Sequence, residues 1–146
     1  MGDGKMPYPQ LVKYNSKSNY RNHFETVYCS GPIITHDGVP VRFKKADFNH
    51  AFFESVNSKD DTFSPLRAER IDWIKAALQD PNSPMYLGWN KKKKCYENNR
   101  RVTLAQGNYV VVIAISKRGN GFFSTAFVAN SHYTLSKIQQ SPAWTP

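Results

Sequence analysis

The sequence predicts an α+β fold in which helices pack on an antiparallel β-sheet within a single compact domain. The chain has 146 residues, of which 40% are hydrophobic and 14% aromatic, and this composition suits one domain with a real core. Apolar residues recur at helical spacing in the first half of the chain. The second half holds apolar runs rich in β-branched residues around a glycine-containing turn, which favours strands joined by a hairpin.

The first half of the chain is expected to hold an irregular N-terminal arm, two strands, a short helix and a polar loop. These elements span residues 1–22, 28–35, 39–43, 47–55 and 58–63. The Asp37-Gly38 step is typical of the tight turn that would join the two strands. Phe48, Ala51 and Phe52 lie at helical spacing and indicate the short helix. The domain proper is expected to span residues 23–146.

A longer helix is predicted to begin after Ser64 and to end before Pro81. Ser64 suits the capping position and Pro65 the first helical position. At about 100° per residue, its apolar side chains form one arc, made by Leu66, Ile71, Trp73, Ile74, Ala77 and Leu78. Arg67 and Arg70 project from within this arc. A lone buried charge is costly, so these arginines reach solvent at the margin, pair with carboxylates, or bind an anion in a cleft.

The second half of the chain is expected to form the sheet and a closing helix. The strands span residues 85–89, 102–105, 109–115 and 122–129. A hairpin turn at residues 117–121 joins the last two, because glycine and asparagine supply positive φ there. Simple alternation along the final strand puts one set of side chains on a shared face: Phe123, Thr125, Phe127 and Ala129. The closing helix starts at Ser131 or Thr134 and runs to about Gln140, with Trp144 as an anchor in the tail.

Net charge and cysteine spacing indicate the kind of partner and the cellular location to expect. The formal net charge is +9, and a small, strongly basic, aromatic-rich domain most simply attracts nucleic acid. Cys29 and Cys95 lie far apart and show neither metal-type nor disulfide-framework spacing. The N-terminus lacks an apolar stretch, and no run approaches membrane-spanning length. A cytoplasmic protein without membrane contact is therefore expected.

His50 is the best-placed histidine for chemistry. On the predicted short helix it points away from the apolar stripe, so it is not an obvious core residue. Imidazole acts as a base or an acid near neutral pH without a large change in pKa. A plain surface histidine fits the same pattern. His23, His36 and His132 are weaker candidates, and no two histidines show the spacing of a metal site. No metal or other cofactor is expected.

A dense basic segment lies between two predicted strands. Its cations are Lys91, Lys92, Lys93, Lys94, Arg100 and Arg101. Tyr86, Trp89 and Tyr96 interleave with them, a mixture that suits backbone phosphates together with stackable bases. A solvated run of charge is the alternative. In the final strand, the hydroxyls of Ser124 and Thr125 either pack among aromatics or bond a phosphate oxygen in a cleft.

Several segments in order resemble the phage and prophage nuclease-like domains of the barnase–EndoU–colicin–RelE superfamily. They are residues 48–52, 67–74, 109–113 and 124–128, followed by an ending like that of residues 135–144. The resemblance covers about residues 40–146. It implies helices packed on an antiparallel sheet and RNA cleavage without a metal. Such domains use a histidine, basic residues and a Ser or Thr around the scissile phosphate, which map onto His50, Arg67, Arg70 and Thr125, with Ser124 as a further binding residue.

The resemblance implies a concrete reaction. His50 would take the proton of a ribose 2′-hydroxyl, which attacks the adjacent phosphorus. Arg67 and Arg70 would stabilise the growing charge, and Thr125 would orient a phosphoryl oxygen. A general acid is not indicated, because a lysine of residues 91–94 and Tyr109 fit equally. DNA lacks the nucleophile, so RNA is the expected substrate.

Three functions remain open from the sequence. The first is an endoribonuclease of phage or prophage origin, a toxin or host-shutdown factor acting on tRNA or another structured RNA in the cytoplasm of a bacterial host. The second is a non-catalytic module that holds nucleic acid in the same cleft. The third is a protein-interaction or inhibitor domain whose charge serves a protein partner, such as an immunity or host defence factor.

Overall fold

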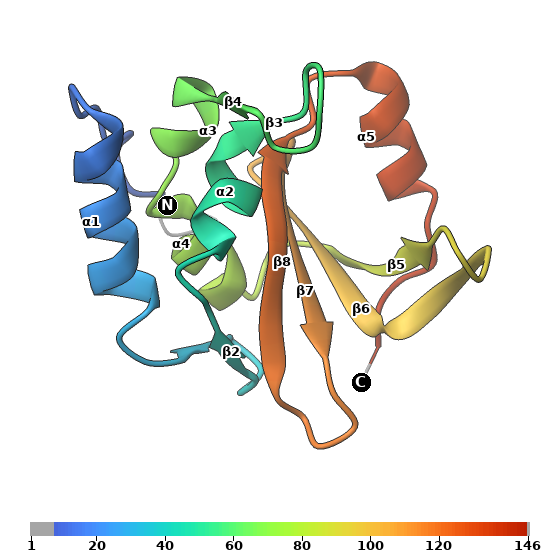
Figure 1. Ribbon diagram of the computed structural model, residues 1–146. Helices are drawn as coiled ribbons and strands as arrows, with labels where there is room; N and C mark the ends of the chain where they lie inside the picture. Colours follow the sequence, from blue (N-terminus) through green and yellow to red (C-terminus); the bar gives the residue numbers. More distant parts are fainter. Residues whose placement is uncertain (1–7, 146) are drawn as a thin grey trace, which may run out of the picture.

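A six-stranded mixed sheet forms the centre of the fold (Figure 1), with strand order β1-β2-β8-β7-β6-β5. The computed structural model describes residues 8–145. Its strands are β1 (Ile33–Ile34), β2 (Pro40–Arg42), β3 (Phe53–Glu54), β4 (Thr62–Phe63), β5 (Met85–Asn90), β6 (Cys95–Ala105), β7 (Tyr109–Ile115) and β8 (Gly121–Val128). Its helices are α1 (Lys17–Tyr28), α2 (Asp47–Phe52), α3 (Pro65–Ala68), α4 (Trp73–Gln79) and α5 (His132–Gln139). The predicted α+β class is confirmed.

Strands β5 to β8 form an antiparallel meander, as the sequence predicts. Strand β2 instead pairs in parallel with β8, with Val41 opposite Gly121 and Arg42 opposite Phe122. Hairpin-connected strands must run antiparallel, whereas β2 reaches β8 through a long connection that permits either direction. The sheet is therefore mixed rather than wholly antiparallel.

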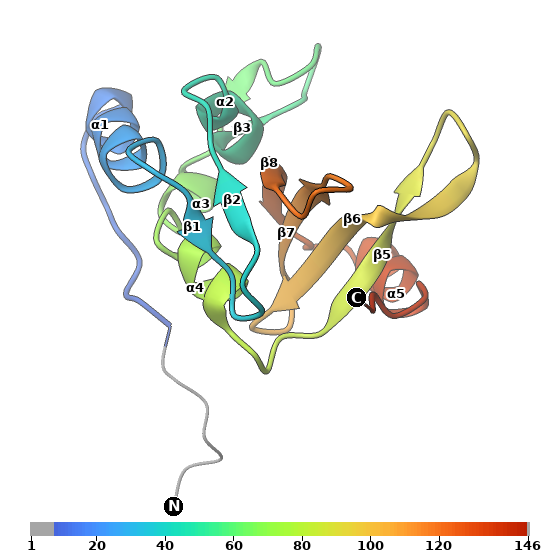
Figure 2. The ribbon, with the colours of Figure 1, turned by 90° about the horizontal axis from the view of Figure 1, so that it is seen from below.

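The two faces of the sheet carry separate apolar clusters. On the face that we call inner, helices α1, α2 and α4 pack on Val111, Ile113, Phe123 and Ala126. On the opposite, outer face, Leu135 and Ile138 of α5 pack on Val110 and Val112. Figures 1 and 2 show α5 beside β5, away from the other helices. None of the helices in the described part of the chain is long and apolar enough to cross a membrane.

Helix α1 corrects two expectations. Residues 17–22 belong to this helix rather than to an irregular arm, and residues 28–35 hold only the short strand β1. Ser16 caps α1 by accepting a hydrogen bond from the Asn19 N–H. Three aromatic side chains four residues apart, Tyr20, Phe24 and Tyr28, are buried on the inner core. So sparse a stripe gives a weak helical signal. The rest of the predicted arm, residues 1–7, lies outside the described residues.

The longer helix predicted between Ser64 and Pro81 is in fact two short helices, α3 and α4, separated by a tight turn. The amides of Arg70 and Ile71 bond the carbonyls three residues earlier. The buried hydroxyl of Tyr28 donates to the Ile71 carbonyl and accepts from the Lys75 N–H, with a distance of 3.0 Å for the second bond. A side chain inserted into the main-chain hydrogen-bond ladder breaks a helix at that point. Because of this break, Arg67 lies in α3 and Arg70 in the turn that follows it, rather than both on one continuous helix.

The segment after α2 also differs from expectation. Helix α2 ends at Phe52, so that β3 takes residues predicted to be helical, and β3 pairs with β4, which lies in the segment predicted to be a loop. The connection between them is organised by Asp61, whose carboxylate accepts hydrogen bonds from the N–H groups of Val56, Asn57 and Ser58. These backbone bonds lower the Asp61 pKa. The β3–β4 hairpin therefore has a defined shape beside the end of α2.

Candidate active site

Helix α2 presents His50 to solvent and buries its other face. Phe48, Ala51 and Phe52 are buried in the inner core, whereas the His50 side chain is 40% exposed. The prediction that His50 lies off the apolar stripe is confirmed. At the start of the helix, the buried carboxylate of Asp47 accepts a hydrogen bond from the Lys44 N–H, which fixes the chain entering α2.

The His50 imidazole is held by Asp60. Its Nδ1 lies 3.0 Å from Oδ2 of Asp60. An ionised carboxylate only accepts hydrogen bonds, so the proton lies on Nδ1 and the lone pair of the neutral ring on Nε2. Asp60 has φ of 51° and its N–H donates to the Ser55 hydroxyl. No local pattern in the sequence points to Asp60, because the pair depends on the β3–β4 hairpin folding back over α2.

Thr125 reaches the same end of α2. Its hydroxyl donates to the His50 carbonyl over 2.9 Å. The register of β8 against β7 shifts between Val112 and Ile113, so that Ser124 is an extra residue in β8. This bulge breaks simple alternation. Phe123 therefore packs on the inner core while Phe127 packs against the outer cluster, which corrects the expected shared face. Ser124 is exposed.

Arg67 is the third predicted residue at the end of α2. Its Nη1 donates to the Phe53 carbonyl over 2.6 Å. A cation beside the carbonyls at a helix end is favourable. Arg67 also lines a cavity of about 180 Å³, which we call the Arg67 cavity, together with Glu54, Asn130 and Thr134. A guanidinium has further N–H donors beyond the one that Phe53 uses, so Arg67 is an anchored cation at a small cavity.

Arg70 has a different environment. Its Nη1 donates to the Leu66 carbonyl over 2.7 Å and to the Glu69 carboxylate over 3.1 Å. Its guanidinium lies 5.2 Å from the centre of the Trp73 ring. Arg67 and Thr125 thus both donate to main-chain carbonyls at the end of α2, those of Phe53 and His50, whereas Arg70 is engaged within the α3–α4 segment. Arg67 and Arg70 have different surroundings because the chain is interrupted between α3 and α4, where the Tyr28 hydroxyl bonds the main chain.

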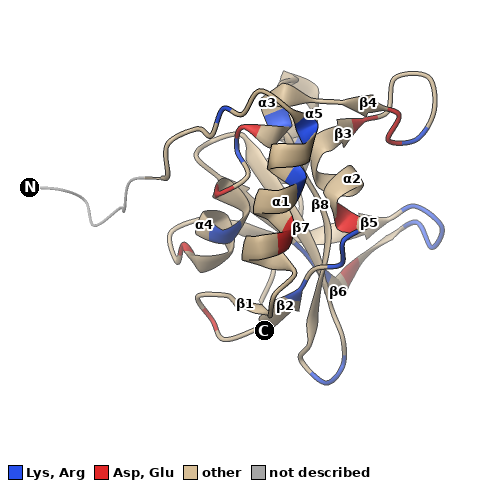
Figure 3. Ribbon diagram, turned by 60° about the vertical axis from the view of Figure 1, so that its left-hand side comes forward, with Lys and Arg blue, Asp and Glu red and all other residues tan. Residues whose placement is uncertain are grey.

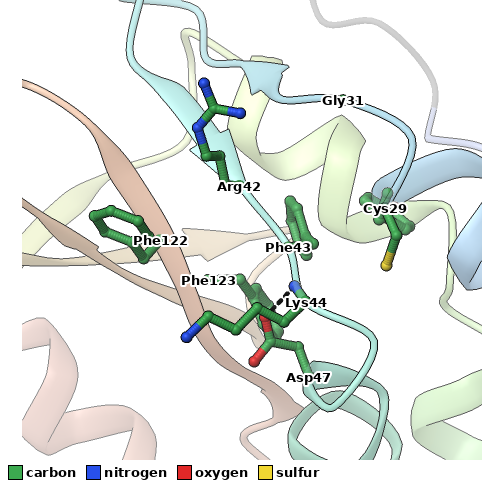
Figure 4. A pocket seen from close by; sticks show the side chains of 9 residues that line it. Cys29, Gly31, Arg42, Phe43, Lys44, Asp47, Phe122 and Phe123 are labelled. Atoms are coloured by element: carbon green, nitrogen blue, oxygen red, sulfur yellow. Dashed lines mark hydrogen bonds between the residues drawn. The ribbon is translucent and has the colours of Figure 1, made fainter.

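A larger pocket lies one helical turn before His50 (Figure 4). This Arg42 pocket has a volume of about 350 Å³, and its lining includes Arg42, Lys44, Asp47 and Phe122. In Figure 4 the Lys44 ammonium group extends toward β8, on which Phe122 lies. The sequence predicted neither Arg42 nor Lys44 as a binding residue. A basic residue on each side of Phe43, followed by Lys45, was the available signal.

The predicted basic surface lies at the tip of the β5–β6 hairpin (Figure 3). Its lysines are exposed: Lys91, Lys92, Lys93 and Lys94. Next to them, the exposed rings of Trp89 and Tyr96 meet edge to face with centres 5.0 Å apart. Arg100 lies on β6 and is half-buried.

Arg101 does not belong to this surface. It is 0% exposed, and its Nη1 lies 2.7 Å from Oδ2 of Asp37. The Trp144 ring covers its guanidinium at 4.7 Å, and the Trp144 indole N–H donates to the Asn98 carbonyl. The predicted anchoring role of Trp144 is thereby confirmed. Arg101 is instead a buried structural cation, because alternation along β6 turns it inward.

Tyr109 is excluded as the general acid that the sequence left open. It is buried in the inner core against Trp73. Burial raises its pKa well above the ordinary value, and Arg70 and Arg67 only partly offset this. A buried phenol with a raised pKa neither meets substrate nor readily releases a proton.

Comparisons of the chain with protein-family models, with curated proteins and with solved structures found no match. Function is therefore inferred from the geometry of the site: an oriented, half-exposed imidazole, an anchored guanidinium beside a small cavity, and a basic pocket one turn away.

Proposed function

We propose that this protein is a metal-independent endoribonuclease with His50 as its general base. The observation that carries the proposal is the His50–Asp60 pair, which leaves Nε2 of an exposed imidazole free of the Asp60 contact. A general base needs a fixed tautomer and access to the proton that it removes. Asp60 supplies the first, and the position of His50 on the solvent side of α2 supplies the second.

The reaction follows from these groups. His50 Nε2 takes the proton of a ribose 2′-hydroxyl, and the oxygen attacks the adjacent phosphorus. The bond from phosphorus to the 5′-oxygen breaks, which yields a 2′,3′-cyclic phosphate and, once the 5′-oxygen gains a proton, a 5′-hydroxyl. Asp60 stabilises the imidazolium that forms. Arg67, held by the Phe53 carbonyl, stabilises the charge on the phosphoryl oxygens.

Thr125 has a positioning role in this scheme. Its hydroxyl donates to the His50 carbonyl and so ties α2 to β8. It does not donate to a phosphoryl oxygen in this arrangement, which differs from the role that the resemblance implies. Arg70 has no part in the chemistry, since its guanidinium binds Leu66, Glu69 and Trp73.

RNA is the proposed substrate and partner. The net charge of +9 favours a polyanion, and only RNA carries the 2′-hydroxyl that this chemistry uses. The resemblance to phage and prophage nuclease-like domains agrees with an RNase that acts in the cytoplasm of a bacterial host.

Incubation of the protein with total RNA in excess EDTA tests the proposal. The wild type should degrade the RNA, and His50→Ala should lower the rate by about 10²–10⁴-fold. His132→Ala is the matched control, because His132 is an exposed histidine on α5, and it should cleave like the wild type. RNA that stays intact with folded wild-type protein would contradict the proposal and leave the non-catalytic nucleic-acid-binding module and the protein-interaction domain.

A further inference from the structure

Part of the outer face of the sheet is exposed near the β7–β8 turn. Helix α5 packs over Val110 and Val112 on this face. Farther along the same face of β7, Ala114 is exposed. Its partner on β8, Phe122, is 42% exposed. An exposed phenylalanine on a sheet face is a surface on which a planar group can stack.

Four side chains form a row across this exposed part. Arg42 on β2 is opposite Phe122 on β8, Phe122 is opposite Ala114 on β7, and Ala114 is opposite Arg100 on β6. Residues directly opposite one another project from the same face. The Arg100 side chain then passes over Gly88 of β5, where an added Cβ would lie 2.3 Å from the Arg100 Cγ. We call Arg42, Phe122, Ala114 and Arg100 the Phe122 row.

We propose that the Phe122 row binds a single strand of RNA, with a base stacked on Phe122 and backbone phosphates on Arg42 and Arg100. This inference rests on the proposed function and names the form of RNA that the protein takes. An unpaired base offers the face that Phe122 needs, whereas the bases of a double helix are already stacked on one another. Three strand spacings span about 14 Å, which is enough for a few nucleotides.

The charge around the row matches a nucleic-acid strand. Lys117 and Arg118 are exposed in the β7–β8 turn next to Phe122. Lys44 lines the Arg42 pocket, which Phe122 also lines (Figure 4). The acidic residue of that pocket, Asp47, is buried and accepts the Lys44 N–H. Cations thus surround the exposed ring.

The row also leads to the candidate active site. Asp47 lines the Arg42 pocket together with Arg42 and Phe122. His50 follows Asp47 by three residues on α2, which is about 4.5 Å along the helix and on a neighbouring face. A strand whose base stacks on Phe122 therefore lies over a pocket that α2, the helix of His50, also lines.

Binding of an uncleavable probe tests the inference independently of cleavage. The probe is a single-stranded 2′-O-methyl RNA of about ten nucleotides, followed by fluorescence anisotropy. Phe122→Ala should weaken binding by about 5- to 100-fold. Phe122→Leu, which keeps apolar bulk, should weaken it similarly. Tyr133→Ala removes another exposed aromatic residue, on α5, and should bind like the wild type.

Salt dependence and a duplex probe complete the test. Combining Arg42→Gln with Arg100→Gln should reduce the slope of log affinity against log salt by about 1.4, as expected for two lost phosphate contacts on a single strand. The same RNA as a duplex should show little change with Phe122→Ala. Unchanged single-strand binding by folded Phe122→Ala, an equal loss for the duplex, or no RNA binding by the wild type would each overturn the inference. Binding that depends on Phe122 without any cleavage by the wild type would support it and contradict only the proposed function.

Discussion

His50 and Asp60 form a hydrogen-bonded pair, 3.0 Å between Nδ1 and Oδ2, across the space between helix α2 and the β3–β4 hairpin. The hairpin connection is held by backbone bonds to Asp61, so the Asp60 carboxylate has a defined position. Orientation of a histidine by a carboxylate is the arrangement that makes imidazole an effective base.

Loss of the Asp60 carboxylate should impair cleavage more than binding. Asp60→Asn is expected to lower the cleavage rate by about 10- to 100-fold, because the imidazole loses its fixed tautomer and the stabilisation of its charged form. Asp72→Asn is the matched control, since Asp72 also pairs with a histidine, through Nε2 of His23 at 2.7 Å, outside the candidate site. Initial rates on RNA measure the effect. Equal rates for Asp60→Asn and the wild type would show that Asp60 does not orient the base.

Arg67 and Arg70 are expected to contribute differently to the cleavage rate. Arg67→Ala is expected to lower the cleavage rate by about 100-fold, because it removes the cation at the Arg67 cavity. Arg70→Ala should leave the rate within about twofold of the wild type. Thermal unfolding of both variants checks that they remain folded. Arg67→Lys keeps the charge but loses the planar fork, and its rate should lie between those of Arg67→Ala and the wild type. Comparable losses for the Arg67 and Arg70 alanine variants would contradict this assignment.

The ion pair of Asp37 with buried Arg101 should make stability depend on pH. Burial acts to raise the Asp37 pKa, but hydrogen bonds from Arg101 and Thr35 outweigh it and hold the pKa below its ordinary value. A lowered carboxyl pKa gives stability that is complete above the unfolded pKa, about 3.9, and is lost as the pH falls through the folded value.

Asp37→Asn should therefore be less stable than the wild type at neutral pH, by an amount toward the lower end of about 3–5 kcal/mol, because Arg101 remains buried and unpaired. Urea unfolding at a series of pH values measures the difference, which should shrink as the pH falls below about 4. Adding Arg101→Met to Asp37→Asn should restore part of the lost stability. A difference that stays constant down to acid pH would contradict this role.

The lysines of the β5–β6 turn should contribute affinity without sequence selectivity. Replacing Lys91, Lys92, Lys93 and Lys94 with glutamine is expected to weaken RNA binding roughly equally for different sequences and to flatten its salt dependence. Exposed lysines on a flexible stem attract phosphates as point charges. Anisotropy titrations at several salt concentrations measure both effects. Unchanged affinity after the replacement would exclude this surface.

Patterns local in sequence predicted the parts of the fold that depend on local rules. The β7–β8 hairpin follows from its apolar runs and turn residues, and the position of His50 follows from helical spacing. Helix α1 was missed because three aromatics in a polar segment give little periodicity. The parallel pairing of β2 with β8 joins segments far apart in the chain, and no local pattern fixes its direction.

The candidate site was predictable only in part for the same reason. His50 lies on α2 and Arg67 and Thr125 contact the main chain at its end, and the resemblance pointed to all three. Asp60 and Phe122 owe their roles to tertiary neighbours: a hairpin that folds over α2, and a sheet face left exposed beyond α5. Arg70 was assigned to catalysis from its place in the apolar arc and from the resemblance, and Arg101 to binding as part of the basic segment, whereas both have partners within the protein.

Cleavage of a DNA oligonucleotide that contains a single ribonucleotide tests the central claim most directly. With EDTA present, the wild type should cut only after the ribonucleotide and leave a 2′,3′-cyclic phosphate, because the 2′-hydroxyl is the nucleophile. His50→Ala should lower the initial rate by about 10²–10⁴-fold while binding the oligonucleotide nearly as well as the wild type. Cleavage at deoxyribonucleotides, or an equal rate for folded His50→Ala, would contradict the assignment of His50 as the base in a ribose-dependent reaction.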